Sequence, residues 1–151
     1  MSKCQGSTLP YFFGAHKSTA PSGEPIDIMA FEYLHGPSMM AYRDNLNDDA
    51  LFAKWKEWDN YRLLAASFVK TLKMAHECKI IHRDLHESNL IIDEENSRIV
   101  VIDWELCVID GEKHEFWEKQ ELMGVQHMVQ RYAGNKYQEA VLEVVKSSRP
   151  L

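Results

Sequence analysis

Residues His82 to Asn89 read HRDLHESN, and VIDWE follows from Val101 to Glu105. Together they place a carboxylate, Asp84, five residues before an amide, Asn89, and a second carboxylate, Asp103, follows an apolar run. A carboxylate can accept a proton from an attacking hydroxyl, while an amide oxygen and a second carboxylate suit a hard cation such as magnesium. This combination of side chains is typical of phosphoryl transfer from a nucleotide.

Two short apolar runs, Asn89–Asp93 and Arg98–Asp103, flank a polar segment and predict a β-hairpin. If the loop has three residues and Asn96 adopts the left-handed conformation, Asn89 pairs directly across from Asp103. Facing cross-strand residues have Cβ atoms about 5 Å apart, close enough to share one cation. A loop of four residues would instead turn the two side chains to opposite faces of the hairpin.

Together these motifs resemble the catalytic loop and the metal-binding strand of the protein kinase fold. The resemblance implies ATP and Mg²⁺ as cofactors and gives each residue a role. Asp84 matches the base that orients the attacking hydroxyl, and Asn89 and Asp103 match the metal ligands. Arg83 belongs to the His-Arg-Asp frame of that family and is therefore a candidate catalytic residue as well.

The motifs also depart from the protein kinase pattern. Trp104-Glu105 replaces the Phe-Gly pair, and His86 stands where protein kinases mostly carry a Lys that touches the transferred phosphate. His86 is therefore a third candidate catalytic residue. DLHxxN and IDWE also resemble the loops of aminoglycoside and choline phosphotransferases, where a Gly usually stands at the position of Arg83. Similar hybrid loops occur in fungal kinase-like proteins.

Two other interpretations of the motif are open. His82 and His86 are four residues apart, a spacing found in zinc sites. Such a pair needs a continuous helix and a third ligand, and the apolar Ile80-Ile81 before it and the hairpin after it argue against a helix. An ordinary hairpin with polar ends that happen to spell the motif is the other alternative.

Two predicted strands precede the motif. They are Leu9–Gly14 and the mostly apolar Ile26–Leu34, which is expected to be buried, and a turn around Pro21 and Gly23 joins them. The segment resembles the fourth and fifth strands and the hinge of the small kinase lobe, although a plain hairpin packed on the helices would give the same pattern. By resemblance, the residues whose backbone would meet the adenine ring are Glu32, Tyr33 and Leu34.

The rest of the chain shows helical periodicity. The predicted helices span Ser38–Asn45, Asp48–Cys78, Glu112–Tyr132 and Lys136–Lys146. In the second of these, Asp59 or Asn60 is expected to cap the start of the main helix. A stripe at helical spacing is expected to be buried, and it consists of Leu64, Phe68, Leu72 and Ala75.

These elements predict a kinase-like α+β fold. It is expected to hold mainly the helical large lobe, with a catalytic-loop β-hairpin and a remnant N-terminal β-hairpin. Residues 1–36 would form the remnant small-lobe hairpin and hinge, and residues 37–151 the helical region, within one structural domain. No glycine-rich loop or phosphate-anchoring Lys strand precedes Leu9, so the chain is expected to be truncated and inactive alone.

Composition narrows the class of protein. Of 151 residues, 45% are hydrophobic and 26% charged, which is usual for a globular chain. The net charge of −6 disfavours binding to nucleic acid or to an anionic membrane. There is no apolar signal core at the N-terminus and no apolar run of the roughly 20 residues that span a bilayer. Together with three widely spaced cysteines, this predicts a cytoplasmic or nuclear protein.

Three functions fit the sequence. The first is a protein kinase-like phosphotransferase that acts on the hydroxyl of a protein substrate. The second is a non-catalytic, pseudokinase-like module that binds a partner chain. The third is a small-molecule phosphotransferase of the aminoglycoside or choline kinase type, which Arg83 makes less favourable.

Overall fold

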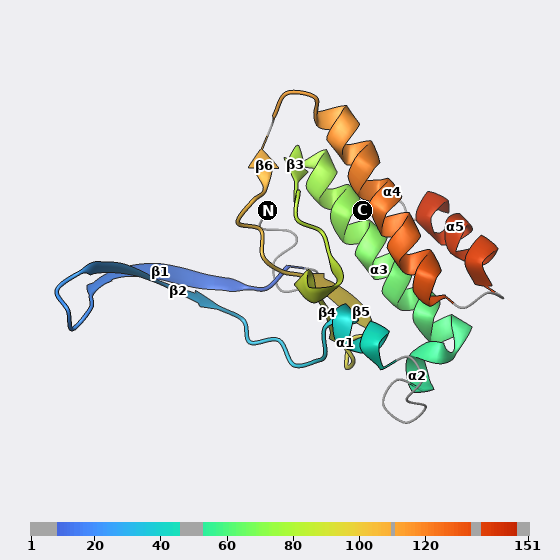
Figure 1. Ribbon diagram of the computed structural model, residues 1–151, viewed down its shortest axis with the longest axis horizontal. Helices are drawn as coiled ribbons and strands as arrows, with labels where there is room; N and C mark the ends of the chain where they lie inside the picture. The colour runs from blue at the N-terminus through green and yellow to red at the C-terminus, as the bar shows by residue number, and fades with distance from the viewer. Residues whose placement is uncertain (1–8, 46–52, 110, 134–136, 148–151) are drawn as a thin grey trace.

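The structure, a computed structural model, describes residues 9–45, 53–109, 111–133 and 137–147. Long helices pack side by side against short antiparallel strands, and a two-stranded hairpin extends from one side of this body (Figure 1). The predicted α+β fold is confirmed. The helices are α1 (Met39–Asp44), α2 (Ala53–Lys56), α3 (Trp58–Glu77), α4 (His114–Tyr132) and α5 (Gln138–Ser147), with a 3₁₀ turn η1 (Glu87–Asn89). The strands pair as β1 (Phe12–Thr19) with β2 (Pro25–Phe31), β3 (Ile80–Ile81) with β6 (Val108–Ile109), and β4 (Leu90–Asp93) with β5 (Arg98–Val101).

Helix α3 forms the centre of the core. Its predicted stripe is buried, with Phe68 and Leu72 fully inaccessible and Leu64 only 1% exposed. The helix is joined to β5 by a hydrogen bond in which the Ile99 N–H donates to Ser67 Oγ at 2.8 Å. Apolar residues that recur at helical spacing need a neighbouring layer, and α3 finds it in β4–β5 and in α4 and α5 (Figure 1).

The predicted helix Asp48–Cys78 is divided in its described part, and residues 48–52 lie outside the described residues. Helix α2 ends before Glu57, whose extended backbone (φ −74°, ψ 130°) is the N-cap position of α3. The prediction that Asp59 or Asn60 caps α3 is therefore wrong. Asn60 instead donates from Nδ2 to the Lys54 carbonyl at 2.8 Å, which satisfies a carbonyl of α2 and stabilises the break.

The hairpin β4–β5 is confirmed, but its predicted register is wrong. Asp93 pairs with Arg98, so the loop has the four residues 94–97, and Leu90 pairs with Val101. Asn89 therefore lies opposite Ile102 rather than Asp103, and the Ile102 N–H donates to the Asn89 carbonyl at 2.9 Å. The side chains of Asn89 and Asp103 are thus not brought together by strand pairing.

Side-chain bonds at the end of the hairpin explain the longer loop. Asp93 accepts the Asn96 backbone N–H at 3.2 Å and the Asn96 side-chain amide at 2.9 Å, and Arg98 donates to Asp93 at 2.7 Å. Ser97, and not Asn96, takes the left-handed conformation, with φ 51°. Burial raises the pKa of Asp93, but these hydrogen bonds and the charge of Arg98 outweigh burial and lower it below its ordinary value.

This lowered pKa predicts a pH-dependent contribution to stability. A carboxyl whose pKa is lower in the folded than in the unfolded chain stabilises the fold above its unfolded pKa, and the stabilisation disappears as the pH falls through the folded pKa. At pH 7, Asp93→Asn should lower the free energy of unfolding by about 1 kcal/mol, and the difference from the parent should shrink below about pH 4. Urea unfolding followed by circular dichroism between pH 7 and pH 3 measures both effects.

The matched control is Glu143→Gln, which removes an exposed ion pair with Lys146, where both side chains are more than two-thirds exposed (74% and 69%). It should leave stability unchanged at either pH because exposed pairs contribute little. A difference between Asp93→Asn and the parent that is equally large at pH 3 and pH 7 would contradict this account.

The N-terminal hairpin, β1 with β2, differs from its prediction in position and in burial. Its strands begin at Phe12 and end at Phe31, and the predicted turn is confirmed by a hydrogen bond from the Gly23 N–H to the Ala20 carbonyl at 2.8 Å. Every residue of β2 is exposed, so the prediction of a buried second strand is wrong. The physical reason is that the hairpin points away from the helices, so no described layer covers its faces (Figure 1).

The chain that leaves the N-terminal hairpin docks on β4. The Ile92 N–H donates to the Pro37 carbonyl at 2.9 Å, and Ser38 forms an isolated bridge with Ile91. Gly36 has a φ of +146°, and a Cβ at this position would collide with the Ile92 carbonyl. Only glycine permits this approach. Ser38 then caps α1 by accepting the Ala41 N–H at 3.2 Å, which confirms the predicted short helix.

Candidate active site in the loop between β3 and β4

The loop from His82 to Asn89 is built on a buried histidine. His82 is fully inaccessible and donates from Nε2 to the Ile102 carbonyl at 2.9 Å. Its Nδ1 accepts the Asp84 backbone N–H at 3.3 Å, so the ring carries its proton on Nε2. His82 thus fixes the backbone of Asp84 against the strand that leads to Asp103. It serves the site as a structural support. Residues 82–86 are not helical, whereas the alternative zinc pair of His82 and His86 would require a continuous helix.

Three of the predicted site residues lie in mutual contact. Asn89 is 6% exposed and donates from Nδ2 to the Asp84 carbonyl at 3.0 Å. The same Nδ2 lies 3.1 Å from His86 Nε2, which in turn lies 3.5 Å from Asp84 Oδ2. Ser88 Oγ is 2.7 Å from His86 Nδ1. The carboxylate of Asp84 and the ring of His86 are about two-fifths and half exposed, so both remain open to a ligand.

Asp103 follows Ile102, whose backbone N–H and carbonyl are both hydrogen-bonded to this loop. Ile102 donates its N–H to the Asn89 carbonyl and accepts from His82 with its own carbonyl, both at 2.9 Å. Asp103 itself is exposed and has a left-handed φ of 61°, which is unusual for a residue other than glycine. The direction of its side chain is therefore set by this turn, not by the alternation of strand β5.

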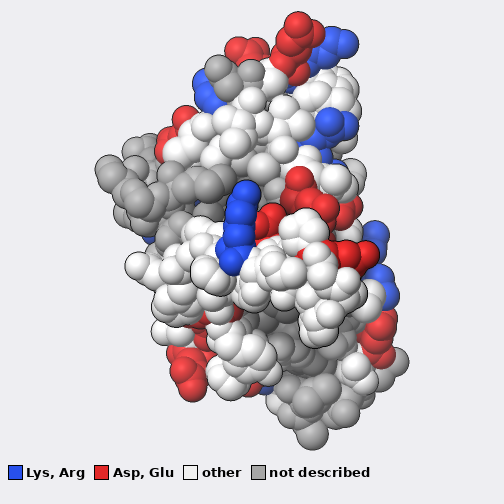
Figure 2. Space-filling model, turned by 90° about the vertical axis from the view of Figure 1, so that its left-hand side faces the viewer, with Lys and Arg blue, Asp and Glu red and all other residues white. Residues whose placement is uncertain are grey.

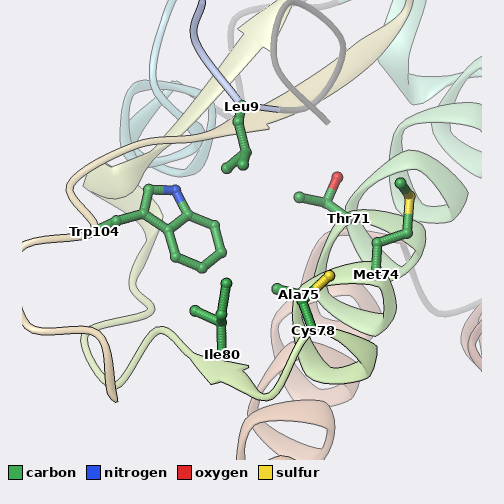
Figure 3. Close-up of a pocket in the computed structure, with 7 residues that line it drawn as sticks. All are labelled: Leu9, Thr71, Met74, Ala75, Cys78, Ile80 and Trp104. Carbon is green, nitrogen blue, oxygen red and sulfur yellow. The ribbon is translucent and has the colours of Figure 1, made fainter. Parts of the chain in front are cut away.

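Trp104 fixes the other side of Asp103. Its Nε1 donates to the Val101 carbonyl at 3.0 Å, and its ring centroid lies 4.5 Å from that of His82. Figure 3 shows the indole ring turned into a small apolar pocket between the strands and α3, where Ile80 and Leu9 lie near it. Because both neighbours of Asp103 are anchored, its backbone has little freedom in this structure.

Asn89 and Asp103 carry oxygen atoms of the kind that magnesium prefers. Within the described residues, the side-chain contacts of Asn89 are made by Nδ2. Its Oδ1 is therefore the amide atom that could bind a cation. Asp103 adds an exposed carboxylate. Magnesium prefers such oxygen ligands and commonly keeps water and substrate phosphates as its other ligands.

Arg83 is held by helix α4. Its backbone N–H donates to Glu121 Oε1 at 2.6 Å, and its guanidinium lies 4.9 Å from the centroid of the Trp117 ring. The residue has a left-handed φ of 69° directly before Asp84. Beside it, side chains of the loop and of α4 line a groove of about 250 Å³.

Residues 23–133 match the protein kinase domain family. The chain belongs to the protein kinase family. The matched segment runs from the turn before β2 to the end of α4 and contains the whole loop, both metal-ligand candidates and the hinge candidates. In this kinase-family chain the His-Arg-Asp frame is therefore part of the matched domain, and the predicted kinase-like fold is confirmed.

The hinge candidates of this kinase domain lie at the base of the N-terminal hairpin. The Glu32 N–H donates to the Tyr11 carbonyl at 2.7 Å, and its carboxylate accepts the Tyr11 N–H at 3.0 Å. Tyr33 is 79% exposed, and its ring lies 4.6 Å from that of His35. Leu34 is half-buried. The Glu32 N–H is therefore already bonded within the hairpin.

Sequence reasoning missed three residues that support the kinase loop. Glu121 and Trp117 lie on α4, far along the chain, and no local pattern connects them with the motif. Glu87 lies inside the quoted motif, and its acidic side chain in a short loop was a signal that could have been used. In the structure it bonds to Tyr132 and Arg131 of α4.

Proposed function

We propose that this kinase domain binds ATP with Mg²⁺ through Asn89 and Asp103, and that Asp84 receives the proton of a protein hydroxyl during phosphoryl transfer. The observation that carries the proposal is the backbone of Ile102, which ties the start of the Asp103 turn to both His82 and Asn89. This arrangement supports a shared site for the three candidate groups. Magnesium, when bound, would offset the negative charge of the phosphates.

In the proposed reaction the hydroxyl oxygen forms a bond to the γ-phosphorus. The bond between that phosphorus and the bridging oxygen breaks, and ADP leaves with the electron pair. The hydroxyl proton passes to the Asp84 carboxylate, which is exposed enough to meet a substrate. We also propose that the side chain of His86, which lies beside Asp84 and Asn89, contacts the transferred phosphate.

Efficient transfer also needs groups that anchor the phosphates. The sequence contains no Gly-x-Gly-x-x-Gly motif, which in protein kinases covers them. We therefore propose that this chain binds the nucleotide weakly and has little turnover by itself, with residues 1–36 as a small-lobe remnant and residues 37–151 as the helical region.

Calorimetric titration of the purified chain with ATP tests the proposal. Binding is expected in the presence of Mg²⁺ and should disappear when EDTA removes the metal. Asp84→Asn should keep this binding and remove any phosphoryl transfer to a protein substrate, because its carboxylate is a proton acceptor and not a metal ligand. Absence of any saturable heat with MgATP would rule out the proposed nucleotide site.

A non-catalytic binding module is the second candidate, and the N-terminal hairpin favours it. Its large apolar side chains are exposed, including Phe13 at 67% and Met29 at 62%. Figure 2 looks at the side of the molecule from which the hairpin projects and shows uncharged residues interspersed with acidic and basic side chains. Exposed apolar side chains on strands with open outer edges are typical of surfaces that associate with another chain. A partner that still binds Asp84→Ala while the chain shows no turnover would support this alternative.

The small-molecule phosphotransferase remains a prediction that rests on the resemblance of His86 and Trp104 to that family's loops. ATP consumption measured with choline or an aminoglycoside, and compared with that measured with a protein substrate, separates it from the first proposal.

Within the described ranges, no helix has both the length and the apolar character that crossing a membrane requires.

A further inference from the structure

One carboxylate of the loop connects it to two helices. Glu87 Oε1 accepts the Tyr132 hydroxyl at 2.9 Å and Arg131 Nη1 at 3.2 Å, both from α4. Its Oε2 lies 3.9 Å from Nη1 of Arg43 in α1. Glu87 is thus a meeting point of three segments that are far apart in the sequence.

The surroundings of Glu87 favour its charged form. Its side chain is only 16% exposed, whereas those of Arg131 and Arg43 are 62% and 39% exposed. Burial raises the pKa of Glu87, but the hydrogen bonds from its own backbone N–H and from Tyr132, with the two arginines, outweigh burial and lower it. The Tyr132 hydroxyl is the best-shielded of these partners, since Tyr132 is only 5% exposed and its ring packs edge-on against Tyr42 at 5.9 Å.

Glu87 is also connected through a short turn to Asn89, one of the two candidate metal ligands. It begins the turn η1, which ends at Asn89, and the Asn89 N–H closes this turn on the His86 carbonyl at 3.0 Å. Asn89 then reaches back from Nδ2 to the Asp84 carbonyl. A shift at Glu87 is therefore passed to Asn89 through one short turn, and from Asn89 to the backbone of Asp84.

We propose that Glu87 is a positioning residue that sets the placement of Asn89 relative to Asp84 by fixing η1 to α1 and α4. This inference rests on the proposed function, and it adds a support that the sequence motif does not reveal. Glu87 acts through Asn89 and contacts no reacting atom. The argument is the convergence of two helices on one carboxylate in the middle of the loop.

The test uses the side-chain amide of Asn89 as a reporter. In nitrogen-15 NMR spectra of the whole chain without nucleotide, Glu87→Ala should shift the Asn89 Nδ2 resonances and increase their exchange with water. Glu87→Gln, which can still accept from Tyr132, should restore most of the parent spectrum. In calorimetry, Glu87→Ala should weaken MgATP binding about tenfold, the scale found for side chains that orient a metal ligand.

The control is Glu143→Gln, whose exposed carboxylate pairs only with Lys146 of its own helix in the described contacts. It should leave the Asn89 signals and the affinity unchanged. If Glu87→Ala does not fold, Tyr132→Phe removes one bond to the same carboxylate and should shift the Asn89 signals in the same direction. Unchanged Asn89 signals in the variant that folds overturn the inference. Because the spectra need no nucleotide, this result is distinct from a failure of the parent chain to bind MgATP.

Discussion

An Asp103→Asn variant is expected to lose at least about 100-fold in magnesium-dependent ATP affinity, close to 2.7 kcal/mol, while its unfolding curve stays that of the parent. The substitution removes the full negative charge that the proposed site offers the cation and leaves a neutral amide of the same shape. Folding should be spared because Asp103 is exposed, and Asn tolerates its left-handed φ of 61° as well as Asp does. Calorimetric titration with MgATP measures the loss.

The matched control for this variant is Glu105→Gln. Glu105 is an exposed carboxylate two residues further along the same segment. Neutralising it changes the net charge by the same amount, so a general electrostatic effect on ATP would appear in both variants. Equal losses in the two, or an Asp103→Asn variant that binds MgATP like the parent, would remove Asp103 from the proposed metal site.

Glu121→Ala should give the largest loss of stability, about 2–3 kcal/mol. The Glu121 carboxylate accepts the Arg83 N–H with one oxygen and the His76 Nε2 at 2.8 Å with the other. Its side chain is 9% exposed and that of His76 is 1% exposed, so water cannot replace the lost acceptor. The strained left-handed backbone of Arg83 would also lose its anchor. Urea unfolding followed by circular dichroism at pH 7 measures the change.

Glu121→Gln separates the two parts of this effect. It retains an acceptor oxygen for one partner but not the charge, so its loss should lie between the parent and Glu121→Ala. Glu118→Ala is a useful comparison, because Glu118 lies 4.0 Å from the other ring nitrogen of His76 and is 38% exposed. A Glu121→Ala variant no less stable than Glu118→Ala would show that the bonds to Arg83 and His76 together contribute little to stability.

The sequence predicted burial most accurately where apolar residues recur at the spacing of a helix. The stripe through Phe68 and Leu72 needed only helical spacing, and the structure buries it completely. The family resemblance came from the motif around Asp84, because the chemistry of phosphoryl transfer restricts both the residue types and their spacing. The loop residues Asp84, His86 and Asn89 accordingly lie together in the structure.

Register could not be predicted in the same way. Whether the β4–β5 loop has three or four residues depends on the bonds that Asp93 makes with Asn96 and Arg98, which apolar periodicity does not encode. The left-handed turn at Asp103 depends on anchors supplied by Trp104 and by His82, which lies further back in the chain. Individual side-chain hydrogen bonds decided both outcomes.

The prediction that the second strand of the N-terminal hairpin is buried was wrong for a related reason. An apolar run such as Ile26–Leu34 indicates a strand that would gain by being covered, but it does not supply the cover. In the structure Ile28 is 49% exposed and Phe31 is 53% exposed. The pattern predicted the strand and its turn, whereas exposure was decided by what lies beside it in space.

The N-terminal hairpin is joined to the helical body by the segment around Gly36 and Pro37, which packs closely on Ile92. A two-stranded element without a covering layer opens locally at low cost, so its amide hydrogens should exchange with deuterium long before those of α3. Differential scanning calorimetry would then report the unfolding of the body formed by the helices with β4 and β5, and would show little heat from the N-terminal hairpin. The hairpin can therefore be ordered or disordered by its surroundings with little effect on the temperature at which the helical body unfolds.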